Sequence, residues 1–111
     1  MKIDPAALQR EYATLRQRLA QVGWISQGYV QDRGPGAGGP CYQWTRKVKG
    51  KTLSVALSKE QFEALQEAIN NWRAMQDILN RMQGLSRSRI FGILPDTRRR
   101  KRLTKKVLGL N

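Results

Sequence analysis

The first quarter of the chain repeats apolar residues at the spacing of an amphipathic helix. Intervals of four, three, four and three residues place them on one helical stripe, formed by Leu8, Tyr12, Leu15, Leu19 and Val22. Asp4 is suited to cap the free amides at the start, and Pro5 to fill the first helical position. Gly23 is suited to the left-handed residue that ends a helix. We therefore expect a helix from about Pro5 to Val22.

The region that follows is expected to hold a short strand and a loop. Trp24 to Val30 contains good β-forming residues, the best of them Tyr29 and Val30. The segment 34–40 is almost entirely Gly and Pro, so we predict a flexible connector without regular structure. A phosphate-binding loop of the nucleotide-hydrolase type would need a Lys followed by Ser or Thr at the start of a helix, and this segment has neither.

Between residues 42 and 57 the pattern alternates with a period of two, as in a β-hairpin. If Lys49 and Gly50 form a two-residue turn, the large apolar residues of both strands share one face. The cross-strand pairs are then Val48 with Lys51, Arg46 with Leu53, Trp44 with Val55 and Tyr42 with Leu57. The opposite face, suited to lie in a groove of a duplex, carries Gln43, Thr45, Lys47, Thr52, Ser54 and Ala56.

A second and longer helix is predicted after the hairpin. Ser58 and Gln61 match a capping box, in which each side chain bonds the backbone amide of the other residue. The apolar stripe that follows ends at Gly84, after about 25 residues. Its members are Phe62, Leu65, Ile69, Trp72, Met75, Leu79 and Met82. We expect this stripe to form the core, because an exposed stripe of this length would aggregate.

Together these elements predict an α+β fold. It consists of an N-terminal helix, a small antiparallel β-hairpin sheet of two or three strands, a long amphipathic helix and a basic C-terminal tail. We place a folded domain at residues 1–84 and the tail at residues 85–111. In the tail, Asp96 or Thr97 is suited to cap a short helix. Without phosphate we expect the tail to be frayed.

The net charge of the chain predicts the class of its ligand. The 111 residues hold 21 Lys and Arg against 8 Asp and Glu, a net charge of +13, and the last 27 residues alone carry +8. Such an excess opposes compaction unless an anion neutralises it, so we expect nucleic acid as the partner. The predicted phosphate contacts are Arg46, Lys47, Lys49, Lys51, Arg87, Arg89, Arg98, Arg99, Arg100, Lys101, Arg102, Lys105 and Lys106.

The residues that catalytic and metal sites most often require are scarce. The sequence has no His and a single isolated thiol, Cys41, so we expect no enzymatic activity, no metal and no cofactor. One cysteine forms no intramolecular disulfide, and the N-terminus shows no leader pattern, which predicts a cytoplasmic location. No apolar run approaches the roughly 20 residues of a membrane helix, so we expect no membrane partner.

Three short motifs lie within residues 28–83. They are Gly39-Pro40-Cys41-Tyr42-Gln43-Trp44-Thr45, Lys49-Gly50-Lys51-Thr52 and Leu57-Ser58-Lys59-Glu60-Gln61. They resemble a family of small bacterial proteins of unknown function that are often encoded beside transposases, although Cys41 replaces an aromatic residue and the Cys-rich segment of some members is absent. The resemblance implies a bacterial mobile-element or defence setting. The order of hairpin and helix also resembles, in shape alone, the small sheet domains with which integrases hold DNA arms.

The sequence thus predicts a non-catalytic accessory protein that binds DNA or RNA for a transposition, recombination or RNA-guided machine. Its protein partner would be a larger transposase or nuclease subunit. The alternative is a protein-interaction module that forms a homodimer, or docks on a partner, through its long helix. No base preference is predicted, because phosphate contacts raise affinity without reading bases.

Overall fold

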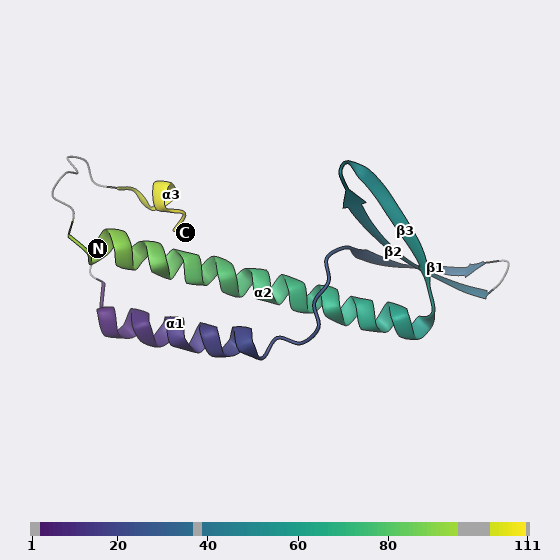
Figure 1. The fold of residues 1–111 in the computed structure, drawn as a ribbon, viewed down its shortest axis with the longest axis horizontal. Helices are drawn as coiled ribbons and strands as arrows, with labels where there is room; N and C mark the ends of the chain where they lie inside the picture. Colours follow the sequence, from purple (N-terminus) through teal and green to yellow (C-terminus); the bar gives the residue numbers. More distant parts are fainter. Residues whose placement is uncertain (1–2, 37–38, 96–102, 111) are drawn as a thin grey trace. The chain divides into compact units, whose positions relative to one another are not determined.

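The computed structural model describes residues 3–36, 39–95 and 103–110. Its elements are α1 (Pro5–Ala20), β1 (Tyr29–Gly36), β2 (Gly39–Val48), β3 (Lys51–Leu57), α2 (Lys59–Gly92) and α3 (Lys105–Leu108) (Figure 1). The strands form one antiparallel sheet in the order β1-β2-β3, which confirms the predicted α+β class. The chain forms two compact units: a sheet unit, Val22–Met75, and a helical unit, which joins Met1–Gln21 to Gln76–Asn111.

α1 begins where the sequence predicts. The Asp4 carboxylate accepts a hydrogen bond of 3.0 Å from the amide of Ala6, and Pro5 is the first helical residue. Leu15 is buried, and the other members of the predicted stripe are half-buried: Leu8, Tyr12, Leu19 and Val22. The amphipathic pattern is therefore confirmed.

The end of α1 differs from the prediction. The helix stops at Ala20, and the amide of Gln21 donates to the carbonyl oxygen of Arg18 at 3.1 Å. Gly23 does not adopt a left-handed conformation. Its missing side chain instead leaves room for Asn71, whose Nδ2 would lie 3.3 Å from a Cβ at this position.

The predicted strand from Trp24 begins only at Tyr29, because the backbone before it pairs with α2. The amide of Ser26 donates to the carbonyl oxygen of Ala68 at 3.2 Å. The side-chain amide of Asn71 donates to the carbonyl oxygen of Trp24 at 2.9 Å. The indole of Trp24 is nevertheless 91% exposed, so this segment holds an aromatic ring in solvent on an anchored backbone.

The Gly- and Pro-rich segment at residues 34–40, predicted as a loop, belongs largely to the sheet. β1 extends to Gly36 and β2 begins at Gly39. The register of β1 shifts after Asp32, whose carboxylate accepts a hydrogen bond of 2.9 Å from the amide of Gly34. This irregularity lets the ladder continue through residues whose composition disfavours strands.

The hairpin of β2 and β3 has the predicted register at every pair, including Trp44 opposite Val55. Lys49 and Gly50 form the turn, with φ angles of 50° and 79°. Positive φ at both central residues matches the right-handed twist of the flanking strands, although Lys adopts it less readily than Gly.

α2 begins with the predicted capping box and ends later than predicted. The Ser58 amide donates to Gln61 Oε1 at 2.9 Å, and the Gln61 amide donates to Ser58 Oγ at 3.1 Å. The helix continues through Gly84 to Gly92, 34 residues or about 51 Å at 1.5 Å per residue. Gly84 does not end the helix but makes room for Leu110, whose Cδ2 would lie 3.3 Å from a Cβ there.

Each unit has a small apolar core. Among the residues whose burial the structure describes, the buried apolar side chains are Leu15, Ile78 and Leu85 in the helical unit, and Ala68 and Ile69 in the sheet unit. The other members of the predicted α2 stripe are half-buried: Phe62, Leu65, Trp72, Met75, Leu79 and Met82.

The tail contains a short helix, but not with the predicted cap. Asp96 and Thr97 lie outside the described residues, and α3 is capped by Thr104, whose Oγ1 accepts a hydrogen bond of 3.2 Å from the amide of Val107. Leu110 packs on α2, so the part of the tail that the structure describes includes a docked helix, and the expected fraying of the tail without phosphate stays a prediction.

Candidate nucleic-acid interface

The free end of the β2–β3 hairpin extends past the end of β1, the other strand of the sheet (Figure 1). Pairing with β1 stops, towards this end, at Tyr29 opposite Thr45, so residues 46–53 form a ribbon of two strands. We call this ribbon the hairpin end. Two strands lie about 5 Å apart, whereas the major groove of DNA is about 12 Å wide.

Four cations occupy the hairpin end, and all are exposed: Arg46, Lys47, Lys49 and Lys51. The register places Arg46 and Lys51 on the face that carries Trp44, Lys47 on the opposite face, and Lys49 in the turn. The Arg46 guanidinium lies 5.6 Å from the centroid of the Trp44 ring, within the range of a cation–π contact. The structure therefore brings these four predicted residues together.

None of these cations has a carboxylate partner among the described residues. The single ion pair there joins Arg81 Nε to Glu11 Oε1 at 2.7 Å, and it belongs to the helical unit. The hydrogen bond from Arg81 lowers the pKa of the Glu11 carboxyl, and the same bond raises the pKa of the Arg81 guanidinium. The positive charge of the hairpin end is thus not neutralised by any carboxylate that the structure describes.

One face of the sheet is polar across all three strands. The register places on it Tyr29, Gln31, Gln43, Thr45, Lys47, Thr52, Ser54 and Ala56. Arg33 Nη1 donates to Gln43 Oε1 at 3.3 Å, which brings a second cation to this face, and Tyr29 is 58% exposed. Amides, hydroxyls and cations of this kind bond both phosphates and base edges.

The opposite, apolar face of the sheet is covered only in part. The Tyr42 ring lies 4.7 Å, between centroids, from the Phe62 ring of α2. Leu53 and Val55 are 45% and 46% exposed. The prediction that large apolar side chains share one face is confirmed, but burial does not reach the hairpin end.

The tail cations that were predicted to contact phosphates have surroundings that differ from those of the hairpin end. Arg87 is half-buried; its Nη2 donates to Gln83 Oε1 at 3.0 Å, and its guanidinium lies against Gly109 after α3. Lys105 and Lys106 are exposed on α3. Arg89 is exposed near the end of α2, and the other five cations of the tail lie outside the described residues: Arg98, Arg99, Arg100, Lys101 and Arg102.

Most of the net charge belongs to the helical unit. Its sequence ranges hold 14 Lys and Arg against 4 Asp and Glu, a net charge of +10. The sheet unit holds 7 against 4, a net charge of +3. The sheet unit therefore offers a local cluster of cations, and the helical unit a larger total.

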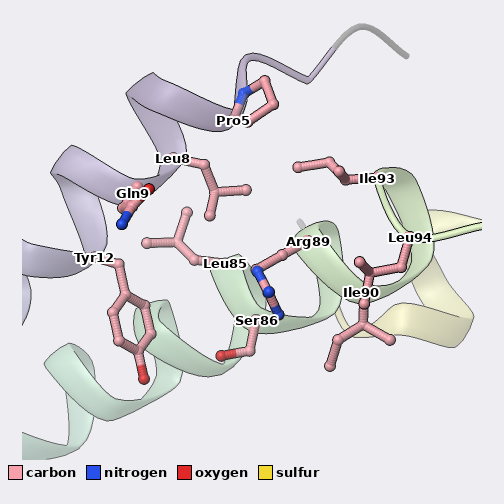
Figure 2. Close-up of a pocket in the computed structure, with 10 residues that line it drawn as sticks. All are labelled: Pro5, Leu8, Gln9, Tyr12, Leu85, Ser86, Arg89, Ile90, Ile93 and Leu94. Atoms are coloured by element: carbon pink, nitrogen blue, oxygen red, sulfur yellow. The ribbon is translucent and has the colours of Figure 1, made fainter.

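An apolar groove that the sequence did not predict lies in the helical unit, between the start of α1 and the end of α2 (Figure 2). Its volume is about 510 Å³, and it is lined by Pro5, Leu8, Gln9, Tyr12, Leu85, Ser86, Arg89, Ile90, Ile93 and Leu94. In Figure 2, Leu8 and Leu85 point toward one another from the two helices. The signal was the apolar run after Arg89, which continues the stripe of α2 once Gly84 is helical.

No protein-family model, curated protein or solved structure matches this chain. The resemblance to proteins encoded beside transposases therefore stays a prediction. Within the described residues, no helix is long and apolar enough to cross a membrane. The same residues contain no group of three or more side chains suited to hold a metal ion.

Proposed function

We propose that this chain is a non-catalytic accessory protein that binds nucleic acid, with duplex DNA as the favoured ligand. The observation that carries the proposal is the hairpin end, where four exposed cations have no carboxylate partner among the described residues. Holding like charges together on a two-stranded ribbon is unfavourable unless a polyanion neutralises them.

The shape of the ribbon favours DNA over duplex RNA. The major groove of B-form DNA admits a two-stranded ribbon, whereas that of A-form RNA is too deep and narrow for side chains to read. The polar sheet face adds amides and hydroxyls that suit a groove, and the hairpin cations suit the phosphates beside it.

The tail adds further charge to this proposal. The +8 of the last 27 residues, which include the run Arg98–Arg102, supplies contacts that do not depend on base sequence. The resemblance to transposase-associated proteins supports a mobile-element setting, in which the chain holds DNA for a larger transposase or nuclease subunit.

Titrating labelled duplex DNA and single-stranded RNA with the protein at several salt concentrations tests the proposal. The test variant is Lys47→Gln, Lys49→Gln, Lys51→Gln. Its slope of log affinity against log salt should flatten by about 3 units on duplex DNA, at about 0.9 for each lost phosphate contact. The control variant removes the same charge from exposed positions of α1, with Arg10→Gln, Arg16→Gln and Arg18→Gln, and should keep the slope.

The outcomes separate three explanations. Equal flattening in the two variants would show that total charge, rather than the hairpin end, holds the ligand. Tighter binding of single-stranded RNA than of duplex DNA would make RNA, rather than DNA, the favoured ligand. A parent protein whose affinity for both ligands does not respond to salt would reject nucleic-acid binding through phosphates.

The groove between α1 and α2 favours a second function, docking on a protein partner. Ile90 and Leu94 line it and remain 45% and 43% exposed, and Arg89 adds a cation to its wall. The occupant we infer is an acidic amphipathic helix of a larger partner. A second copy of the chain is disfavoured, because it would bring two units of +10 together.

A synthetic helix of about five turns, with Leu on one face and Glu on the other, tests this docking. It should bind the parent and lose affinity for Leu94→Asp, while the same peptide with Lys in place of Glu should not bind. Reversible dimers in sedimentation that Leu94→Asp abolishes would favour a second copy as the occupant. Equal binding of the two peptides would reject charge complementarity.

A further inference from the structure

α3 lies beside α2 in the helical unit (Figure 1), and glycines stand at the contact between them. A Cβ at Gly84 of α2 would lie 3.3 Å from Leu110 Cδ2. A Cβ at Gly109, after α3, would lie 2.9 Å from Arg87 Nη1. Each glycine thus leaves space that a side chain of the other element occupies.

This approach leaves an open hollow of about 430 Å³ between the two helices, which we call the α2–α3 hollow. Its lining includes the cations Arg81 and Lys105 and the side chains of Asn80 and Ser88. Neither the Asn80 amide nor the Ser88 hydroxyl has a hydrogen-bond partner among the described residues. Arg87 borders the hollow through Gly109.

The charges around the hollow are unbalanced. Arg81, Arg87 and Lys105 come together from two elements, and the carboxylate found in contact with them is Glu11, which accepts bonds of 2.7 and 2.9 Å from Arg81. One carboxylate does not neutralise three cations, so docking of α3 brings like charges together.

We propose that the α2–α3 hollow is a binding site for phosphate groups. A guanidinium, an ammonium, an amide and a hydroxyl offer donors in several directions, which suits the oxygens of a phosphate better than a planar carboxylate. The volume exceeds that of one phosphate and has room for two linked phosphates. The choice of nucleic-acid backbone over free phosphates as the ligand rests on the proposed function.

Phosphate binding and the docking of α3 are thermodynamically linked. A phosphate in the hollow offsets the repulsion between Lys105 and the arginines of α2, so it stabilises the docked helix. By reciprocity, any change that undocks α3 weakens phosphate binding even when every charge is kept.

Inorganic pyrophosphate, titrated at constant ionic strength, is the first probe. Hydrogen exchange of the Leu110 amide, which donates to the carbonyl oxygen of Lys105 at 2.8 Å, reports the folding of α3, which docking on α2 stabilises. Pyrophosphate should slow this exchange, and chloride at equal ionic strength should not. Lys105→Gln should weaken pyrophosphate about tenfold, whereas the neighbouring Lys106→Gln, which removes the same charge outside the lining, should change it less than about twofold.

Gly84→Leu tests the geometry without a change of charge. Its side chain would occupy the place of Leu110, while Leu favours helix more than Gly does, so circular dichroism should show α2 intact. Pyrophosphate affinity should fall about tenfold, as in Lys105→Gln. Unchanged affinity in Gly84→Leu, or equal losses in Lys105→Gln and Lys106→Gln, would overturn the proposal.

A duplex oligonucleotide as the second probe separates this inference from the proposed function. If both hold, duplex DNA competes with pyrophosphate, and the hairpin variant at Lys47, Lys49 and Lys51 loses duplex affinity but keeps pyrophosphate affinity. If pyrophosphate shows the expected pattern and duplex DNA does not compete, the site takes free phosphates and the nucleic-acid assignment of the hollow is rejected.

Discussion

The indole Nε1–H of Trp44 donates a hydrogen bond of 3.1 Å to the carbonyl oxygen of Gln27. This bond joins the central strand of the sheet to the segment before β1. Residue 28 must be glycine for it to form: a Cβ there would meet the indole nitrogen and lie 2.9 Å from the carbonyl oxygen of Thr45. Gly28 also has a φ of +119°, which L side chains rarely adopt.

Gly28→Ala should therefore destabilise the protein by about 2 to 3 kcal/mol, through backbone strain and the clash with Trp44. Gly34→Ala is the matched control, because Gly34 has a φ of +76° with nothing within 4 Å of a Cβ. It should lose only about 1 kcal/mol. Urea unfolding of both variants measures the difference, and equal losses would contradict the contact with Trp44.

Substitution of Lys49 separates the effect of turn strain on stability from the effect of charge on DNA binding. Lys49→Asn should stabilise the hairpin by about 0.5 to 1 kcal/mol, because Asn tolerates the positive φ better, and should lower the salt slope of DNA binding by about 0.9. Lys47→Gln removes the same charge from an ordinary strand position. It should lower the slope equally without raising the melting temperature. A Lys49→Asn variant that melts below the parent would contradict the left-handed turn.

The Glu11–Arg81 pair predicts a small pH dependence. Because the hydrogen bond from Arg81 lowers the folded-state pKa of Glu11, the pair adds stability above the ordinary pKa of a Glu carboxyl, about 4.3, and loses it as pH falls through the folded-state value. Both side chains are exposed, so Glu11→Gln should lose less than about 1 kcal/mol at pH 7. Parent and variant should converge in acid. A difference that persists or grows there would contradict the lowered pKa.

Glu11→Gln also bears on the α2–α3 hollow. Glu11 occupies Arg81 Nε and Nη2, so removal of its carboxylate gives an anion further donors. Pyrophosphate affinity at pH 7 should therefore rise about threefold, the effect of one partly screened charge. Calorimetric titration measures it. An unchanged affinity would mean that Arg81 does not contribute to the hollow.

Trp24 provides a test of the anchored segment before β1. Of the three Trp residues, Trp24 is 91% exposed, and Trp44 and Trp72 are half-buried. Trp24→Phe should remove most of the iodide-quenchable fluorescence and leave the melting temperature unchanged, because its ring has little packing to lose. Trp72→Phe should lower the melting temperature and leave most of the iodide-quenchable fluorescence in place. A lower melting temperature for Trp24→Phe would mean that the ring is packed in solution.

The parts of the fold that local rules govern were predictable. The hairpin register follows from alternation around a two-residue turn, and the start of α2 follows from the Ser58 capping box. The end of α2 was not predictable, because Gly commonly ends a helix, and the side chain that fills the space beside Gly84, Leu110, lies 26 residues further along the chain. The strand predicted from Trp24 failed for the same reason, since its backbone partners belong to α2.

The two candidate sites also differ in how far the sequence predicts them. The four cations of the hairpin end are neighbours in sequence, so composition and period reveal them. The α2–α3 hollow joins Arg81 to Lys105, and the ion pair beside it spans 70 residues between Glu11 and Arg81. No periodicity in one segment reports such a meeting, because it is created by packing between distant segments.

The way in which the two units divide the chain has a consequence for biosynthesis. Residues 22–75 form the sheet unit without interruption, so it can complete its contacts as soon as that stretch has left the ribosome. α1 is synthesised earlier, yet Leu85 of α2, toward which Leu8 of α1 points, emerges only after the whole sheet unit. The apolar stripe of α1 must therefore wait uncovered during translation, and this stage is where chaperones would engage the nascent chain.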